Sequence, residues 1–161
     1  MVILLMGVSG SGKTTIGRIL AAALGWEFHD ADELHPAANR DKMRRGIPLT
    51  DSDRAPWLSS VRDLIDDRLA RNGNAVVACS ALKQSYRERI VADPSKVRLV
   101  YLKGSPELVA RRLARRSGHF MPASLLPSQL AALEEPRDAL TIDISGTPEQ
   151  IADSIRTAVG V

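Results

Sequence analysis

The sequence Gly7-Val8-Ser9-Gly10-Ser11-Gly12-Lys13-Thr14 contains a glycine, four further residues and then Gly-Lys-Thr, which is the phosphate-loop pattern. It directly follows the apolar run 2–6, which is typical of a buried parallel strand. After it, apolar residues recur at helical spacing at Ile16, Ile19, Leu20, Ala23 and Leu24. The pattern therefore lies between a strand and a helix, the context that a phosphate loop requires.

The residue types in this loop suit the binding of a polyphosphate. Glycines allow backbone conformations that other residues avoid, and the first turn of the following helix offers unpaired N–H groups to an anion. We expect Lys13 to reach the β- and γ-phosphates and Thr14 to be a ligand of Mg²⁺. The alternative is a glycine-rich turn without a ligand. The predicted nucleotide-binding residues here are Gly7, Val8, Ser9, Gly10, Ser11, Gly12, Lys13, Thr14 and Thr15.

Composition limits the class of protein and its partners. The 161 residues suffice for one domain with a sizeable core, and we expect a single domain over 1–161. The net charge is only +3, and one basic tract at 111–116 is weak support for nucleic acid, so we expect no nucleic-acid partner. No apolar run is long enough to span a bilayer, so we expect no membrane partner. One cysteine, Cys79, suits a reducing cytoplasm.

An acidic pair follows the second predicted strand. Residues 26–29 have the pattern of a short strand, and Asp30 and Asp32 come at its carboxyl end, where alternation places both side chains on one side. Ligands of open α/β sheets gather at this edge. One carboxylate suits Mg²⁺ and the other suits acceptance of a proton from a substrate hydroxyl, while turn formation or helix capping is the alternative role.

Further polar residues follow the next predicted elements. Residues 36–50 are polar and basic and form an excursion from the core, and a helix follows in which Arg54 and Trp57 read on pattern alone as a solvated charge and a core anchor. The strand 75–79 ends in Cys-Ser without a carboxylate, which leaves metal binding to Asp30 and Asp32. The arginine tract leads into a loop, and 114–126 is a candidate lid over the nucleotide, with a solvated basic face as the alternative.

Strands and helices alternate along the chain. The predicted strands are 2–6, 26–29, 75–79, 97–102 and 140–144, with helices between them. Such alternation predicts an α/β fold with a five-stranded parallel sheet and helices on both faces.

Several blocks resemble the gluconokinase family. Besides the phosphate loop they are residues 30–36, Asn39 with Lys42-Met43, 48–58, 79–83 with Tyr86-Arg87, 101–104, 116–120 and 133–136. The phosphate loop alone marks a superfamily, whereas the His-Pro, Asp-Arg-x-Pro-Trp-Leu and Cys-Ser-Ala-Leu-Lys blocks together are much more specific. The resemblance covers nearly the whole chain in order.

The resemblance implies a kinase domain that transfers the γ-phosphoryl group of ATP to the 6-hydroxyl of D-gluconate. The implied fold is a three-layer α/β/α phosphate-loop fold of the nucleoside- and shikimate-kinase type, with a substrate-binding segment at 33–57 and the lid at 114–126. The cofactors are ATP and Mg²⁺, and the protein is expected to be a cytoplasmic homodimer. The rival functions are a kinase of another small hydroxy acid such as shikimate and, more remotely, a nucleotide switch or nucleic-acid module.

The resemblance also assigns roles to residues. Lys13, Asp32, Arg112 and Arg116 are implied to be catalytic, with Asp32 orienting or deprotonating the acceptor hydroxyl. Thr14 and Asp30 are the implied magnesium residues. Arg112, Arg116, Thr147 and Pro148 are implied to complete the nucleotide site. The implied substrate-binding residues are Asp32, His35, Arg54, Ser80, Lys83, Arg87 and His119.

Overall fold

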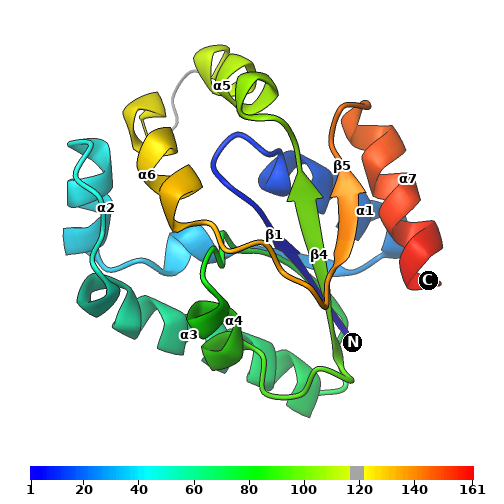
Figure 1. Ribbon diagram of the computed structural model, residues 1–161. Helices are drawn as coiled ribbons and strands as arrows, with labels where there is room; N and C mark the ends of the chain where they lie inside the picture. The colour runs from blue at the N-terminus through cyan, green and yellow to red at the C-terminus, as the bar shows by residue number, and fades with distance from the viewer. Residues whose placement is uncertain (117–121) are drawn as a thin grey trace.

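The order of strands and helices follows the predicted alternation. A computed structural model describes residues 1–116 and 122–161 (Figure 1). The elements in chain order are β1 (Val2–Met6), α1 (Lys13–Leu24), β2 (Glu27–Asp30), η1 (Ala31–Leu34), α2 (Ala37–Arg44), α3 (Asp51–Ala70), β3 (Ala75–Ala78), α4 (Gln84–Ile90), β4 (Val97–Lys103), α5 (Pro106–Ala114), η2 (Ala123–Leu125), α6 (Leu126–Ala132), β5 (Leu140–Asp143) and α7 (Pro148–Val159). Within the described residues, none of the helices has the length and apolarity needed to cross a bilayer.

The strands form a parallel sheet with β1 at its centre. Over residues 1–116 and 122–161 the sheet has five strands in the order β2-β3-β1-β4-β5, and each neighbouring pair is parallel. Strands β1 and β3 are buried along their whole length, which explains why both appear in the sequence as continuous apolar runs. The predicted five-stranded α/β fold is confirmed.

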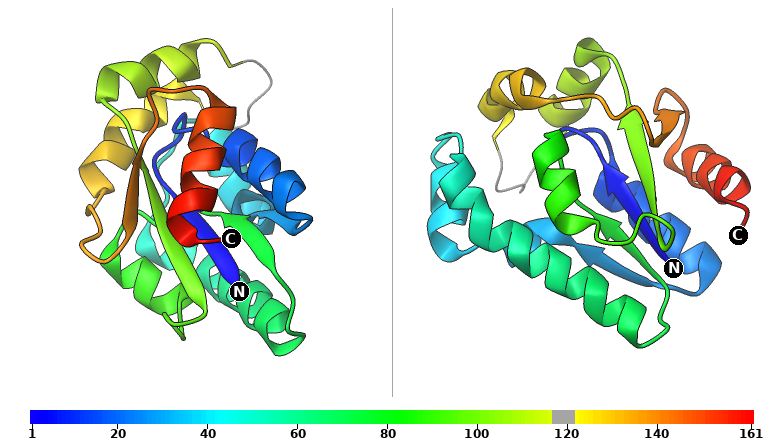
Figure 2. Two further views of the ribbon diagram at one scale, coloured as in Figure 1. Left: turned by 90° about the vertical axis from the view of Figure 1, so that its right-hand side faces the viewer. Right: turned by 60° about the horizontal axis from the view of Figure 1, so that its bottom comes forward.

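Helices cover both faces of this sheet, which gives three layers (Figure 2). On one face, Ile3 and Leu5 of β1 belong to an apolar cluster that includes residues of α1, α5 and α7. On the other face, Val2, Leu4 and Met6 pack with residues of α3 and α4. Successive side chains of β1 thus point to opposite cores, as the pleat of a strand requires.

The segment between β2 and β3 extends beyond the sheet and carries η1, α2 and α3. Helix α3 begins at Asp51 because Thr50 and Asp53 form a capping box: the Asp53 N–H donates to Thr50 Oγ1 (3.1 Å) and the Thr50 N–H donates to Asp53 Oδ2 (2.9 Å). Pro56 lies inside this helix.

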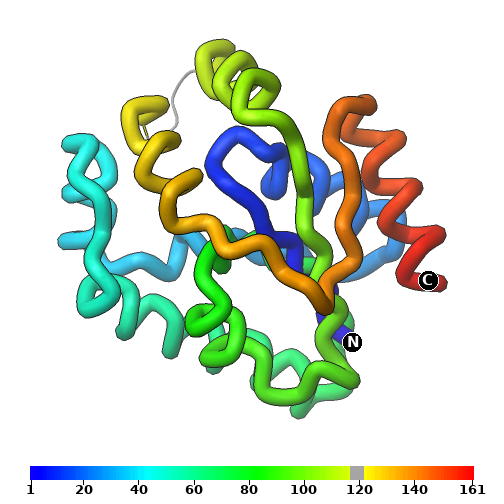
Figure 3. The backbone as a smooth tube through the Cα atoms, in the orientation of Figure 1, coloured from blue at the N-terminus to red at the C-terminus, as the bar shows by residue number. Residues whose placement is uncertain are grey.

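The loops that follow β1, β2 and β3 meet at one edge of the sheet. The Gly7 N–H donates to the Ser80 carbonyl oxygen at 3.4 Å, which joins the phosphate loop to the loop after β3. Met43, Leu49 and Leu125 form a small apolar cluster that joins the α2 region to η2. The backbone of these segments can be followed in Figure 3, and the carboxyl edge of the sheet is the place to look for a site.

Candidate active site

The phosphate loop presents its backbone to an anion. Gly12, the N-cap of α1, has a left-handed conformation with φ of 93°, and no side chain caps the helix or adds an acidic charge to its first turn. Gly10 has φ of 85°, and a Cβ there would lie 2.7 Å from Leu113 and 3.0 Å from the Val109 carbonyl oxygen of α5. The loop therefore needs glycine both for its conformation and for its close packing against α5.

Polar groups in this loop also favour a polyphosphate. Lys13 Nζ donates to the carbonyl oxygens of Gly7 (2.8 Å) and Val8 (3.0 Å), so its charge lies over the loop. Burial lowers the pKa of Lys13, while Asp32 and Asp30 act in the opposite direction. The hydroxyls of Ser9 and Ser11 are buried without a hydrogen-bond partner in the described part of the chain. A polyphosphate accepts hydrogen bonds from such groups.

Asp30 and Thr14 lie in direct contact. The Thr14 hydroxyl donates to Asp30 Oδ2 at 2.8 Å, and Asp30 Oδ1 accepts the Asp32 N–H at 3.0 Å, which caps η1. Both groups are hard oxygen ligands beside the phosphate loop, so they fit Mg²⁺, which takes few protein ligands when it also binds phosphates. Among the described residues there is no cluster of three His, Cys, Asp or Glu side chains suited to a metal ion. The pair Thr14 and Asp30 is therefore our candidate magnesium site.

Asp32 is half-buried next to this pair. Burial, with the charge of Asp30 as the second cause, raises its pKa to about 6, although Lys13, Arg116 and Arg40 favour the charged form. A carboxylate with a pKa close to neutrality is suited to accept a proton from a hydroxyl.

Asp32 also lines two adjoining cavities. The first, about 20 Å³, is the donor cavity, lined by Ser9, Gly10, Gly12, Lys13, Thr14, Asp32, Ser80, Arg116 and Gln129. The second, about 40 Å³, is the acceptor cavity, lined by Asp32, His35, Met43, Pro48, Leu49, Arg54, Trp57, Ser80, Leu82, Leu125, Ser128 and Gln129. Asp32, Ser80 and Gln129 belong to both. Both volumes are far below the roughly 300 Å³ of a small-molecule site, so each cavity covers only part of the space that its ligand would fill.

Arg54 supplies the positive charge of the acceptor cavity. Its Nη1 donates to the Leu49 carbonyl oxygen (2.6 Å) and to the Tyr86 hydroxyl (3.3 Å), and its guanidinium lies 5.5 Å from the centre of the Tyr86 ring. Its Nε and Nη2 have no protein acceptor among the described residues. The guanidinium is therefore held in place and still has donors for a carboxylate.

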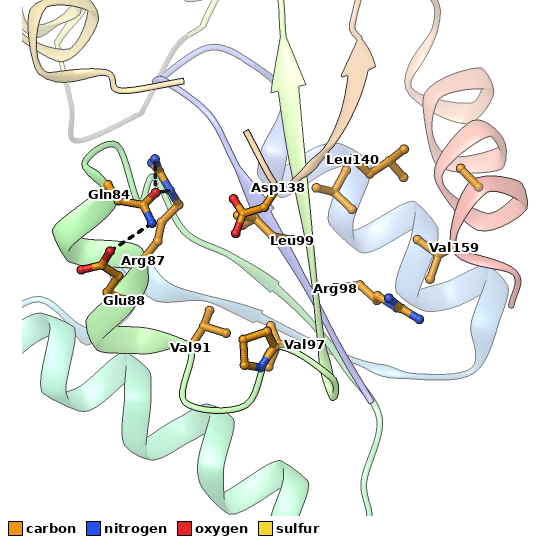
Figure 4. A pocket seen from close by; sticks show the side chains of 13 residues that line it. Gln84, Arg87, Glu88, Val91, Val97, Arg98, Leu99, Asp138, Leu140 and Val159 are labelled. Carbon is orange, nitrogen blue, oxygen red and sulfur yellow. Dashed lines mark hydrogen bonds between the residues drawn. The ribbon is translucent and has the colours of Figure 1, made fainter. Parts of the chain in front are cut away.

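Two predicted substrate residues lie outside this cavity. Arg87 lies on the wall of a separate cavity of about 390 Å³ between α4, β4 and α7 (Figure 4). Its donors are directed to the carbonyl oxygens of Ala81 (2.8 Å), Leu82 (3.0 Å) and Glu134 (2.8 Å). Arg87 thus braces the loop that carries Ser80 and does not line the acceptor cavity, so its contact with the substrate stays a prediction.

Lys83 also points away from the acceptor cavity. Its ammonium group pairs with Asp51 at 3.3 Å, and Asp51 also accepts a hydrogen bond from the Tyr86 hydroxyl. Lys83 is therefore connected to Arg54 only indirectly, through Asp51 and the Tyr86 hydroxyl. His119 lies outside the described residues, and so does the middle of the expected lid, whereas Ala114 ends α5 and residues 123–126 form η2 and the start of α6.

The predicted arginines lie near the nucleotide side. Arg116 lines the donor cavity together with Lys13. Arg112 Nη2 donates to the carbonyl oxygens of Ile144 and Gly146, and Nη1 lies 4.0 Å from the Cβ position of Gly12. Arg112 thereby links the phosphate loop to the turn that precedes α7, where Thr147 and Pro148 stand.

Sequence reasoning missed Gln129 of α6. Its Oε1 accepts the Ser9 N–H at 2.6 Å, and the residue is 9% exposed between the two cavities. The sequence did contain a signal for it. Gln129 is a polar residue three positions after Leu126 and next to Leu130, so it lies among apolar positions that are expected to face inward.

A phosphate loop with an acidic pair beside it and a second cavity behind that pair defines an ATP-dependent phosphate-loop kinase. Residues 2–136 match the AAA domain family. The chain is 53% identical over 136 residues to the gluconokinase of Gluconobacter oxydans (strain 621H), covering 84% of this chain and 76% of that protein. It is 44% identical over 160 residues to the thermosensitive gluconokinase of Escherichia coli (strain K12), covering 97% and 86%. The chain therefore belongs to the gluconokinase family.

Solved structures agree with this assignment. The crystal structure of a gluconokinase from Sinorhizobium meliloti 1021 matches with a TM-score of 0.83 at 42% identity, covering 98% of this chain and 90% of that one. Shikimate kinase from Aquifex aeolicus vf5 matches with a TM-score of 0.66 at 17% identity, which shows the shared fold. The fold expected from the sequence, that of the shikimate-kinase type, is confirmed.

Proposed function

We propose that this chain, as one kinase domain over residues 1–161, transfers the γ-phosphoryl group of ATP to the 6-hydroxyl of D-gluconate. The observation that carries the proposal is the pair of adjoining cavities that share Asp32. The donor cavity has the features of a polyphosphate site. The acceptor cavity contains the Arg54 guanidinium, whose Nε and Nη2 have no protein acceptor among the described residues. Relatives at 44–53% identity that are named gluconokinase support the choice of acceptor.

On the donor side, the N–H groups at the start of α1 and the Lys13 ammonium hold the phosphates of ATP. Thr14 and Asp30 hold Mg²⁺, which when bound neutralises charge on the β- and γ-phosphates. Arg116, which lines the same cavity, faces the negative charge that spreads over the transferring phosphoryl group. Arg112, Thr147 and Pro148 form the outer part of the nucleotide site.

On the acceptor side, Arg54 binds the gluconate carboxylate, and His35 and Ser80 hydrogen-bond its hydroxyls. Asp32 accepts the proton of the 6-hydroxyl as that oxygen forms its bond to the γ-phosphorus and the bond from the γ-phosphorus to the ADP oxygen breaks. The proton then passes from Asp32 to solvent. Closing the site around both substrates keeps water from attacking ATP.

The assembly and compartment are part of the same proposal. We expect a homodimer in the cytoplasm, as for the family that the chain resembles. Cys79, the one cysteine, is buried, and burial raises its pKa to about 12, so it suits a reducing compartment as an inert apolar residue. Light scattering on the purified protein tests the dimer.

The decisive experiment measures ADP release with a panel of sugar acids and hydroxy acids that includes gluconate and shikimate. We expect gluconate to give the highest kcat/KM, dependent on Mg²⁺, and the product's phosphorus NMR spectrum to show a primary phosphate ester at position 6. Preference for shikimate would move the chain to another acceptor, and ADP release without any acceptor would contradict kinase activity.

A further inference from the structure

Asn39 of α2 is a buried polar residue behind the acceptor cavity, and no role in the proposed function uses it. It is 4% exposed. Its side-chain nitrogen Nδ2 donates to the Asp53 carbonyl oxygen at 2.8 Å and lies 3.2 Å from Nδ1 of His35. One amide group therefore joins the start of α3 to a histidine that lines the acceptor cavity.

These two contacts determine which nitrogen of His35 carries the proton. A backbone carbonyl can only accept, so the amide nitrogen of Asn39, and not its oxygen, must face Asp53. The second hydrogen of the same NH₂ group then faces Nδ1, which must accept it with a lone pair. In a neutral imidazole the proton is then on Nε2.

The ring is also fixed in orientation. His35 stacks on Trp57 with ring centres 4.2 Å apart and planes inclined by 14°. Trp57 is itself anchored, because its indole N–H donates to the Ala31 carbonyl oxygen at 2.7 Å. Nε2 has no hydrogen-bond partner among the described residues, so it is available to a ligand in the cavity that His35 lines.

The surrounding charges keep this imidazole neutral. Burial, followed by the charges of Arg54 and Arg40, lowers the pKa of His35 to about 4. A second cation beside Arg54 is thereby avoided, and His35 adds a neutral donor beside the charged donor of Arg54. Such a pair matches a molecule with one carboxylate and several hydroxyls.

We propose that Asn39 is a positioning residue that fixes the Nε2–H tautomer of His35, so that this ring donates to a hydroxyl oxygen of the sugar acid while Arg54 binds the carboxylate. The proposal rests on the proposed function for the identity of the acceptor. It gives α2 a purpose, because this helix stands outside the sheet and supplies the residue that orients the donor.

The first test observes the tautomer directly and needs no substrate. The chain has three histidines, so two-bond proton–nitrogen NMR spectra of the labelled protein are readily assigned with His29→Gln and His35→Gln variants. At pH 7.5 we expect His35 to be neutral with its proton on Nε2. In Asn39→Asp the carboxylate can only accept, so we expect the proton to move to Nδ1 or the ring to become charged. A wild-type His35 with its proton on Nδ1 would overturn the proposal.

The second test is kinetic. In Asn39→Asp and Asn39→Ala we expect KM for gluconate to rise by about tenfold, as for the loss of one well-oriented hydrogen bond, with KM for ATP within about twofold. Asp41→Ala is the matched control on the same helix, since Asp41 is exposed and pairs only with Arg45 in the described residues. Folded Asn39 variants with unchanged KM for gluconate would overturn the proposal.

A pair of His35 variants makes the test independent of the stability of Asn39 variants. The Gln amide nitrogen reaches the position of Nε2, whereas the shorter Asn amide reaches only the position of Nδ1. We therefore expect both substitutions to raise KM for gluconate, and we expect His35→Asn to raise it about tenfold more than His35→Gln does. Equal effects of the two substitutions would contradict a donor at Nε2.

The outcomes separate this inference from the proposed function. If the wild-type protein prefers another sugar acid, the proposed function fails, and the same variants are measured with that acid. The inference about Asn39 then stands if KM for that acid rises as stated and fails if it does not.

Discussion

The donor and acceptor cavities share a wall but are built in different ways. The donor cavity is lined mainly by one continuous stretch, the phosphate loop, whose backbone and glycines suit an anion. The acceptor cavity is assembled from side chains of η1, α2, α3, the loop after β3, η2 and α6, which are far apart in the sequence. A site made of local backbone can be recognised from eight residues, whereas a site made of dispersed side chains needs the whole fold.

The largest expected effect tests the donor side. Lys13→Ala removes the ammonium group over the phosphate loop, and we expect kcat to fall by at least about a hundredfold. The measurement is coupled ADP release with gluconate. Lys96→Ala is the control, because Lys96 is exposed and pairs with Asp93 at 3.3 Å away from both cavities. A folded Lys13→Ala protein with near-normal turnover would show that the loop backbone suffices.

The shared wall is tested next with Asp32→Asn, which keeps the size of the side chain and removes the base. We expect kcat to fall by at least about a hundredfold. A mild loss would mean that Asp32 only positions the acceptor.

The same variant has an opposite effect on stability. The folded-state pKa of Asp32, about 6, lies above its ordinary value of 3.8, so ionisation of this carboxyl group destabilises the folded protein. The penalty is absent below pH 3.8, grows as pH rises to about 6 and is fully present above it. Urea unfolding at pH 7.5 should find Asp32→Asn more stable by about 2 kcal/mol, with the difference lost near pH 4. Equal stability at pH 7.5 would contradict the raised pKa.

Arg87 tests whether the acceptor cavity depends on a support behind it. Arg87→Met removes the guanidinium donor from the carbonyl oxygens of Ala81, Leu82 and Glu134, of which Leu82 keeps the Glu134 N–H, and we expect a loss of about 2–4 kcal/mol in the free energy of unfolding. KM for gluconate should stay within about threefold, measured well below the melting temperature. Arg89→Met on the same helix is the exposed control. A large rise in KM with intact stability would restore Arg87 as a substrate residue.

The smallest expected effect is on KM for gluconate and tests the acceptor cavity. Arg54→Lys keeps the charge but replaces the planar fork by a point charge, so we expect KM for gluconate to rise about tenfold with KM for ATP unchanged. Steady-state kinetics with each substrate varied in turn measure both values. Arg62→Lys on the same helix, where Arg62 pairs with Asp66 at 2.5 Å, is the matched control. If KM for ATP rose instead, Arg54 would belong to the donor cavity.

The sequence predicted the fold well because strands and helices here have local signals. The apolar runs 2–6 and 75–79 coincide with buried strands, since a strand covered on both faces has to be apolar throughout. The start of α3 is set by the capping box of Thr50 and Asp53. The box requires the side chains of Thr50 and Asp53 to pair, and the sequence of residues 50–53 does not by itself determine which side chains pair.

For the acidic pair, the expected grouping was right and the expected geometry was wrong. Strand alternation ends at Asp30, because the chain enters η1 at Ala31. The two carboxylates nevertheless lie together, since Asp30 caps η1 through the Asp32 N–H and also accepts from Thr14. The contact with Thr14 arises from packing of β2 and the phosphate loop around one edge of the sheet, which local pattern does not encode.

Predictions of individual acceptor residues were less secure for a physical reason. A motif gives a residue's position along the chain but not the direction of a long side chain. Arg87 and Lys83 carry flexible cations, and each finds oxygen partners outside the cavity. Gln129 was missed because its place in the site rests on the hydrogen bond from the Ser9 N–H, and Ser9 lies 120 residues away in the sequence.

The wall that the two cavities share is formed by Asp32, Ser80 and Gln129, and it limits how the acceptor specificity can change in evolution. A substitution in that shared wall is expected to change the binding of ATP and of the sugar acid at once. Selection for a new acceptor therefore conflicts there with selection to keep ATP binding. Met43, Pro48 and Leu49 line the acceptor cavity alone and are free of this conflict. Directed evolution toward longer or shorter sugar acids should therefore accumulate its changes around these three positions.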